Sequence, residues 1–295
     1  MTDIASLNSN WLVLSPTWTA IDNDPTSLQL IAGENASWSD ILDQAQSAQD
    51  QNMQVAIFPK ITYPDGMDDW WNSAPRDFSW WVTWWDRFEK FTLHHAELAS
   101  KTNATALILG GVGVSPALPS GLLSDGSSSG TPGDTTQRWR DLLAKVRSIY
   151  SGTIYWGQLF DGKAEGGLEP PAFIDAVDGI YLLWAAPLEG DTPASLADRE
   201  AEAARLLDTI ILPMQQVINK PLFLAPVIAS TELQTQYEDY SILLNAAATR
   251  DWISGFVSRF YYPPVILQDD SFSIHGKTAE SAVRHWYSGW TNQLP

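Results

Sequence analysis

The chain has 295 residues, 44% of them hydrophobic and 18% charged, so it can build a sizeable core and does not have the composition of a disordered protein. Its 17 basic and 35 acidic residues give a formal net charge of −18, which argues against nucleic acid and anionic membrane surfaces as partners. Cysteine is absent, which excludes disulfides and thiolate metal sites, and no apolar run reaches the roughly 18–20 residues of a membrane span.

Tryptophan is the one residue type that is unusually frequent, with 15 copies. Indole rings stack on the apolar faces of sugars, and they also fill protein cores. Composition alone therefore leaves two alternatives open, a sugar-binding surface and a densely packed interior.

The first hundred residues alternate apolar strands with helices. Strands are predicted over Asn10–Trp18 (NWLVLSPTW) and Met53–Ile61 (MQVAIFPKI). Between them, a helix is predicted from an N-cap at about Ser37, with Asp40 three positions on, to about Gln51.

A second helix is predicted over Ser79–Thr102, and it carries aromatic side chains near helical spacing. Such a stripe is typical of a face that packs into a core rather than of a binding platform. The members of the stripe are Trp81, Trp84, Trp85, Phe88, Phe91 and His95.

The stretch from Ala104 to Trp139 combines a buried strand, a long loop and a helix. The apolar run Ala104–Leu109 stops at a double glycine, a Gly/Pro/Ser-rich loop of about two dozen residues follows, and a helix begins near Thr135. Connections in compact domains usually span about 2–6 residues, so this loop is either functional or disordered. We expect it to form one wall of a binding site.

The remaining sequence repeats the alternation of strand and helix. A proline at position 213 is expected to kink the longest of these helices. The predicted strands are Thr153–Leu159, Asp178–Pro187, Pro221–Ser230 and Ser254–Tyr262, and the predicted helices are Pro170–Val177, Ser195–Asn219, Gln236–Ile253 and Thr278–Trp290.

Alternating strands and helices of this kind predict an α/β fold with parallel strands, either a barrel or a doubly wound sheet. The absence of a Gly-rich phosphate loop after the first strand weakens the second choice. We therefore predict a (β/α)8-type TIM barrel that forms a single domain over residues 1–295. Only about ten residues precede Trp11, so either the barrel lacks its first βα unit or the chain is a piece of a longer protein. A partner chain or a preceding domain would then complete the barrel, because open sheet edges invite pairing.

Several strand exits and helices together resemble a known group of proteins. The segments LSPTW, LILGG…PALPSG, RWRDLLAKVRSIYSG, PPAFIDAVDGIYLLW and GFVSRFYYPPVILQDDSFSIHGKTAE are similar to glycoside-hydrolase-type TIM-barrel domains of bacterial surface or secreted proteins. The resemblance covers nearly the whole chain. It implies an extracellular or cell-surface location, although no signal peptide follows Met1.

In retaining members of that superfamily, a glutamate after strand four is the acid/base and one after strand seven is the nucleophile, about 5–5.5 Å apart. If the barrel lacks its first βα unit, the strands that correspond to strands four and seven of a complete barrel are Ala104–Leu109 and Pro221–Ser230. The residues near the ends of these strands are Val112, Gly113, Ala225 and Pro226. These side chains can neither protonate a glycosidic oxygen nor attack an anomeric carbon. The chain is therefore expected to bind a polysaccharide or oligosaccharide without the usual catalytic glutamates.

The alternative is an active glycoside hydrolase that uses other carboxylates at the strand exits. Asp161, Asp269 and Asp270 are the candidate catalytic residues, although aspartate is also common in turns as a backbone cap. The carboxylate oxygens of the Asp269–Asp270 pair beside His275 suit Ca²⁺, but the loop lacks the alternating Asp/Asn pattern with a closing Glu that binds this ion. No metal and no cofactor are expected.

Aromatic residues at or just after the strand ends are the candidate sugar-binding residues, with barrel-top packing as the alternative. If they form a sugar platform, their rings should be partly exposed beside polar groups. Trp184 and the pair Trp70–Trp71 are the favoured platform. The full candidate set is Trp18, Tyr63, Asp69, Trp70, Trp71, Trp184, Tyr261 and Tyr262.

Overall fold

The computed structural model describes residues 1–295 except 164–167, 189–194, 228–229, 263–264, 266–268 and 292–295. The chain divides into two compact units that interleave along the sequence. Unit 1 comprises Met1, Trp11–Gly157 and Pro171–Asp178, and unit 2 comprises Thr2–Asn10, Gln158–Pro170 and Gly179–Pro295. Each unit is described by itself, and the prediction of a single domain stays a prediction.

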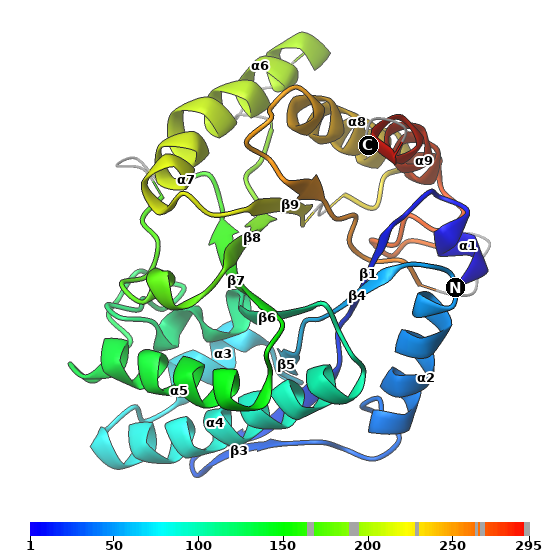
Figure 1. Cartoon of the computed structure of the whole chain (residues 1–295). Coiled ribbons are helices and arrows are strands. Elements are labelled where there is room, and N and C mark those ends of the chain that lie inside the picture. Colours follow the sequence, from blue (N-terminus) through cyan, green and yellow to red (C-terminus); the bar gives the residue numbers. More distant parts are fainter. Residues whose placement is uncertain (164–167, 189–194, 228–229, 263–264, 266–268, 292–295) are drawn as a thin grey trace. The chain divides into compact units, whose positions relative to one another are not determined.

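Unit 1 is built on parallel strands, drawn from blue to green in Figure 1. They are β1 (Trp11–Leu14), β4 (Gln54–Ile57), β6 (Ala106–Gly110) and the first part of β7 (Thr153–Phe160). Their pairs are all parallel, with Leu14 opposite Ile57 and Leu107 opposite Ile154. The most buried of them, β6, is the apolar run that the sequence predicted from Ala104 to Leu109.

A second, three-stranded sheet extends β1 and β4 beyond their carboxyl ends. It consists of β2 (Thr17–Asn23), β3 (Thr26–Gln29) and β5 (Lys60–Thr62) in the order β3-β2-β5. Thr17 pairs with Lys60 in the same register as Leu14 with Ile57, and only Pro16 and Pro59, which lack an N–H, interrupt the strands. The single strand predicted over Met53–Ile61 is therefore two strands, and the hairpin of β2 and β3 was not predicted.

Two of the helices of unit 1 begin at side-chain caps. They are α2 (Trp38–Gln49), α3 (Met67–Ser73), α4 (Phe78–Lys101) and α5 (Thr135–Ile149), with one-turn helices at η1 (Val112–Ala117) and η2 (Ile174–Ala176). Ser37 and Asp40 form the predicted capping box of α2, and Asp77 caps α4. The helix predicted over Pro170–Val177 shrinks to η2.

The predicted aromatic stripe on α4 is confirmed as core. All six of its members are buried, and they join rings from α3, α5 and β7. The Trp84 ring stacks on Phe88 at 4.8 Å, and Trp85 contacts Trp139 edge-on at 5.3 Å. Edge-to-face pairs of this kind add to the energy of area burial. Much of the tryptophan content of unit 1 is therefore explained by packing.

His95 lies inside this aromatic core. Its Nδ1 lies 2.8 Å from the Phe91 carbonyl oxygen, and burial lowers the pKa of the imidazole to about 3. An unfolded histidine titrates near pH 6.5, so the unfolded state binds more protons between about pH 6.5 and 3. The stability that His95 contributes as a neutral ring is present above that window and is lost as the pH falls through it.

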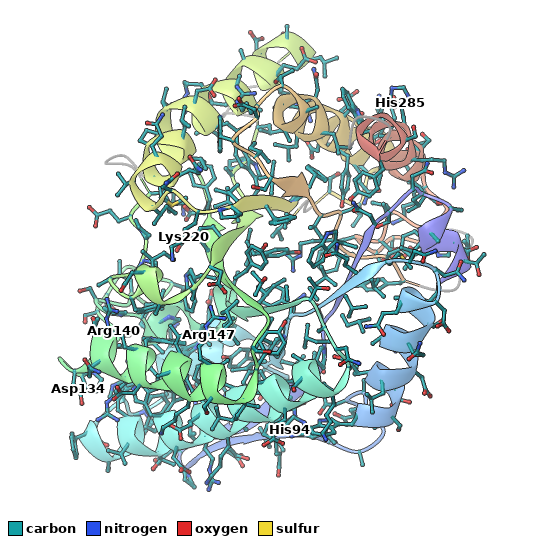
Figure 2. The ribbon with its side chains drawn as sticks, in the orientation of Figure 1. His94, Asp134, Arg140, Arg147, Lys220 and His285 are labelled. Carbon is teal, nitrogen blue, oxygen red and sulfur yellow. The ribbon has the colours of Figure 1, made fainter. Side chains whose placement is uncertain are left out.

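We therefore expect the free energy of unfolding to fall by up to about 1.4 kcal/mol per pH unit below about pH 6.5 because of His95. The free energy of unfolding, measured by urea titration at several pH values from 7 to 4.5, should fall less steeply with decreasing pH for His95→Leu than for the parent. His285→Leu is the control, since His285 is exposed on α9 (Thr278–Thr291; Figure 2). The same pH dependence of the free energy of unfolding in His95→Leu and in the parent would contradict the lowered pKa of His95.

Unit 2 contains the strands β8 (Gly179–Trp184), β9 (Leu222–Pro226) and β10 (Gly255–Phe256). Tyr181 pairs with Phe223 and Phe256 pairs with Leu224, both in parallel. The strand predicted over Ser254–Tyr262 is confined to β10, and the rest of that segment has no regular structure where it is described.

The helices of unit 2 are α1 (Thr2–Ala5), α6 (Leu196–Leu206), α7 (Leu212–Ile218), α8 (Leu233–Ala248) and α9. The helix predicted over Ser195–Asn219 is interrupted by a π-helical turn at Leu207–Ile211, just before Pro213. A proline at this position cannot donate to the preceding turn, which fits the predicted kink. Helices α8 and α9 pack against each other (Figure 1).

The main parallel sheet contains seven strands within the described residues, in the order β1-β4-β6-β7-β8-β9-β10. Strands that follow one another in the chain and are joined by helices are thus neighbours in the sheet, as in a barrel-type α/β fold. Each of the seven strand segments predicted from the sequence contributes one strand to this sheet, which among the described residues has one strand fewer than the eight of a complete barrel. Among the described residues, no helix is long and apolar enough to cross a membrane.

Candidate functional site

The exit of β6 in unit 1 is shaped by two glycines. Gly110 and Gly111 both have a φ of +91°, and the Gly111 N–H donates to the Gly157 carbonyl oxygen at 2.8 Å. A Cβ added at Gly110 would lie 2.8 Å from the Trp156 ring. This exit is therefore packed against an indole, and only glycine fits where the strand ends.

The turn that follows is held by the Gly113 carbonyl oxygen. It accepts hydrogen bonds from the Tyr63 hydroxyl at 2.7 Å and from the Trp71 Nε1–H at 3.2 Å. Burial raises the pKa of Tyr63. Tyr63 and Trp71 are both predicted sugar-binding residues, and in the structure their hydrogen bonds position the turn Val112–Ala117.

The expected exposure of the Trp70–Trp71 pair is wrong. Only 8% of Trp70 and 2% of Trp71 is exposed, because rings from α4 cover them. Their indole faces cannot stack on a sugar in this arrangement. Asp69, on the same helix α3, is exposed.

Trp18 is half-buried on β2 and packs against helix α4. Its ring lies 4.9 Å from His94, which Figure 2 marks on that helix, and 5.7 Å from Phe91. The side chain thus fills the space between the extension of β1 and α4.

A small hollow in unit 1 was missed by sequence reasoning. It lies between the three-stranded sheet and helices α3 and α4. The Thr26 hydroxyl and the Trp70 Nε1–H, which both line it, are buried and have no hydrogen-bond partner among the described residues. The full lining is Ala20, Thr26, Ser27, Leu28, Ile61, Tyr63, Trp70, Trp84 and Arg87.

In unit 2, the expected exposure of Trp184 is also wrong. The side chain is 2% exposed, its Nε1–H donates to the Ala186 carbonyl oxygen at 3.0 Å, and its ring packs edge-on against Phe160 at 5.0 Å. Trp184 is a core residue at the end of β8. The exit of β9, at Ala225 and Pro226, is likewise buried.

The three candidate carboxylates all belong to unit 2. Asp161 is exposed and accepts a hydrogen bond from the Lys163 N–H at 3.1 Å, as a turn cap does. Asp270 is exposed. Asp269 accepts hydrogen bonds from the Ser271 N–H and hydroxyl at 2.8 and 2.9 Å and lies 3.6 Å from Lys277 Nζ.

These contacts determine what Asp269 can do chemically. The hydrogen bonds from Ser271, followed by the Lys277 charge, lower the pKa of its carboxyl. A carboxyl held ionised can stabilise positive charge or orient a hydroxyl, but it is poorly suited to donate a proton at neutral pH. Asp269 therefore does not fit the role of general acid.

Of the two aromatic residues predicted after β10, Tyr262 is exposed, whereas Trp70 and Trp71 of unit 1 are buried. The Tyr262 N–H donates to the Ser273 hydroxyl at 3.0 Å, and His275 Nδ1 lies 2.9 Å from the Tyr262 carbonyl oxygen. The Tyr262 side chain is nevertheless 49% exposed. Tyr261, in contrast, stacks on His275 at 4.2 Å, and burial raises its pKa to about 12.

Phe260 adjoins Tyr262, and Phe272 in turn adjoins Phe260; we call these three rings, Phe260, Tyr262 and Phe272, the aromatic patch. The Phe260 ring lies 6.0 Å from Tyr262 and 6.1 Å from Phe272, and Phe272 is 41% exposed. Of these, only Tyr262 was predicted. The signal for the others was their place near a strand exit, in a segment rich in aromatic residues.

No protein-family model matches the chain, and no curated protein matches it. Solved structures do. A GH113 β-1,4-mannanase is 16% identical with a TM-score of 0.68, and the match covers 97% of this chain and 90% of the mannanase. The GH113 β-mannanase from Alicyclobacillus acidocaldarius in complex with ManMIm is 19% identical with a TM-score of 0.69 and the same coverage.

The endo-1,4-β-mannanase from Rhizomucor miehei is 12% identical with a TM-score of 0.62, and the match covers 99% of this chain and 89% of the enzyme. At such low identity the likeness concerns the course of the backbone and not individual side chains. The parallel strand order and these matches agree on the architecture. The chain therefore has the TIM-barrel fold of these glycoside hydrolases.

Proposed function

We propose that the protein binds a polysaccharide or oligosaccharide at the carboxyl ends of its strands and does not hydrolyse it by the two-glutamate mechanism. The aromatic patch of unit 2 is the observation that carries this proposal. Tyr262 has its backbone fixed from both sides by Ser273 and His275 while its ring is half-exposed. A rigidly held, exposed ring loses little entropy when a sugar stacks on it.

The strand exits support the non-hydrolytic part of the proposal. The exit of β6 carries Gly110, which packs against Trp156, followed by Gly111 and Val112, and the exit of β9 carries alanine and proline. A retaining glycosidase needs a carboxyl at each of two facing positions. Among the candidate replacements, Asp269 is ion-paired and Asp161 caps a turn.

The experiment is a glycan array combined with a hydrolysis assay. We expect binding of at least one saccharide and no release of reducing ends from β-1,4-mannan, which the mannanases named above act on. Tyr262→Ala should weaken binding by about tenfold or more, since loss of a stacking ring costs roughly 1–3 kcal/mol. The thermal melting temperature should stay near that of the parent.

Tyr237→Ala is the matched control, because Tyr237 is 37% exposed on α8 and belongs to no patch described above. It should leave saccharide binding unchanged. Hydrolysis that is lost in Asp161→Asn or Asp270→Asn would instead establish the enzymatic alternative. A parent protein that binds no saccharide would refute the proposal.

A further inference from the structure

Among the described residues of unit 2, one partly buried guanidinium has no carboxylate partner. Seven arginines form ion pairs with carboxylates within the described residues. This is unsurprising in a chain with 35 acids and 17 bases. The buried members of that group follow the rule, since Arg199 and Arg250, with side chains 4% and 12% exposed, are both paired.

Arg259 departs from it. The residue lies three positions beyond the end of β10 and is only partly exposed. Within the described part of the chain, no carboxylate lies within ion-pair distance of its guanidinium and no acceptor hydrogen-bonds to it. The guanidinium lies over the Phe260 ring, with its carbon 4.8 Å from the ring centroid.

The surroundings of Arg259 are tyrosines rather than acids. The charged or titratable groups that act on the guanidinium are Tyr181, Tyr240 and Tyr262, and burial lowers the pKa of Arg259. Its backbone is fixed, since its carbonyl oxygen accepts a hydrogen bond from the Tyr240 hydroxyl at 3.2 Å. The result is a positioned, partly desolvated cation at a strand exit, and its N–H donors lack a described acceptor.

Partial desolvation of a charge without a counter-charge is costly, and an anionic ligand would reduce that cost. Guanidinium is planar and presents parallel N–H donors that match a carboxylate in a bidentate pair. Arg259 also acts on Tyr262 and lies over Phe260, so it adjoins two of the three rings of the aromatic patch. A sugar that stacked on the patch would bring a ring substituent towards the guanidinium.

We propose that Arg259 binds the carboxylate of an acidic sugar, so that the saccharide bound at the aromatic patch is one that contains uronic acid. This proposal rests on the proposed function and specifies its substrate class. The net charge of −18 does not oppose it, because a guanidinium beside the ligand outweighs screened charges farther than a Debye length of roughly 8–10 Å.

The test compares two ligands that share the same sugar backbone and differ at the carboxyl group, a short oligogalacturonate with charged carboxylates and its uncharged methyl ester, by titration calorimetry. The parent should bind the acid about tenfold to a hundredfold more tightly than the ester, as expected for a charge-assisted hydrogen-bonded pair. Arg259→Gln should abolish that preference. Arg259→Lys keeps the positive charge but lacks the two parallel N–H donors, so it should retain only part of the preference for the acid.

Arg205→Gln is the matched control, since it removes the same charge from an exposed arginine on α6 that pairs with Glu202. It should leave the preference for the acid intact. Equal affinity of the parent for acid and ester would overturn the proposal, as would a preference that survives Arg259→Gln. If the glutamine variant does not fold, a lysine variant with an undiminished preference overturns it.

Binding of β-1,4-mannan separates the two proposals. A parent that binds mannan but does not discriminate acid from ester would leave saccharide binding in place and remove only the role of Arg259. A parent that binds no saccharide of the glycan array, these three included, would remove both proposals.

Discussion

Replacing Trp184 by alanine should destabilise the protein by about 3–5 kcal/mol, the usual cost of truncating a buried tryptophan. The side chain is 2% exposed, packs against Phe160 and donates its indole N–H to the Ala186 carbonyl oxygen. The substitution thus opens a cavity and leaves a buried carbonyl without its donor. Thermal melting and chemical denaturation of the purified variant would measure the loss.

Phe78→Ala is the control for Trp184→Ala, since Phe78 is an aromatic side chain that is 76% exposed at the start of α4. It should change the stability by less than about 0.5 kcal/mol. A second readout is saccharide binding by Trp184→Phe, which keeps an aromatic ring in the core. That variant should bind as the parent does, and a selective loss of binding at unchanged stability would show that Trp184 contacts the sugar.

Removal of Arg199 should have an effect of similar size for an electrostatic reason. This side chain is 4% exposed and connects α6 to α8 through Glu238 at 2.6 Å and Asp239 at 2.5 Å. Breaking a buried pair by removing one partner costs about 3–5 kcal/mol, because the remaining charge stays uncompensated. Glu238 and Asp239 are 29% and 20% exposed, so solvent screening places Arg199→Met near the lower end, about 3 kcal/mol.

Arg205→Met is the matched control on the same helix, where Arg205 is 53% exposed and pairs with Glu202. Exposed pairs of this kind are worth about 0–1 kcal/mol. The triple variant Arg199→Met/Glu238→Gln/Asp239→Asn should recover part of the stability lost in Arg199→Met, since it removes the unpaired acids. Equal losses for Arg199→Met and Arg205→Met would refute the buried-pair assignment.

The sequence by itself determined the order and type of most elements, because these depend on local patterns. The apolar run before Gly110 became β6, Ser37 with Asp40 became the cap of α2, and the aromatic residues of α4 at helical spacing became core. Each signal lies within a few residues of the structure it produces. The hairpin of β2 and β3 escaped prediction because its segment continues a strand after Pro16 without an apolar run of its own.

The location of candidate site residues at strand ends could also be read from the sequence, but their exposure could not. Tyr262 and Trp184 both follow or end a strand, yet one is 49% exposed and the other 2%. Trp184 is covered by Phe160, and Trp70 and Trp71 are covered by rings of α4. A ring becomes platform or core according to which distant side chains reach it, and this depends on packing between elements.

The same holds for charge. The sequence does not indicate which of Arg199 and Arg259 has a carboxylate partner, since the chain contains about twice as many acidic as basic residues. Arg199 meets two carboxylates from positions about forty residues away, whereas Arg259 meets tyrosines. Ion pairing depends on distances of a few ångströms between residues that the fold brings together, so only the tertiary structure decided which of the two arginines has a carboxylate partner among the described residues.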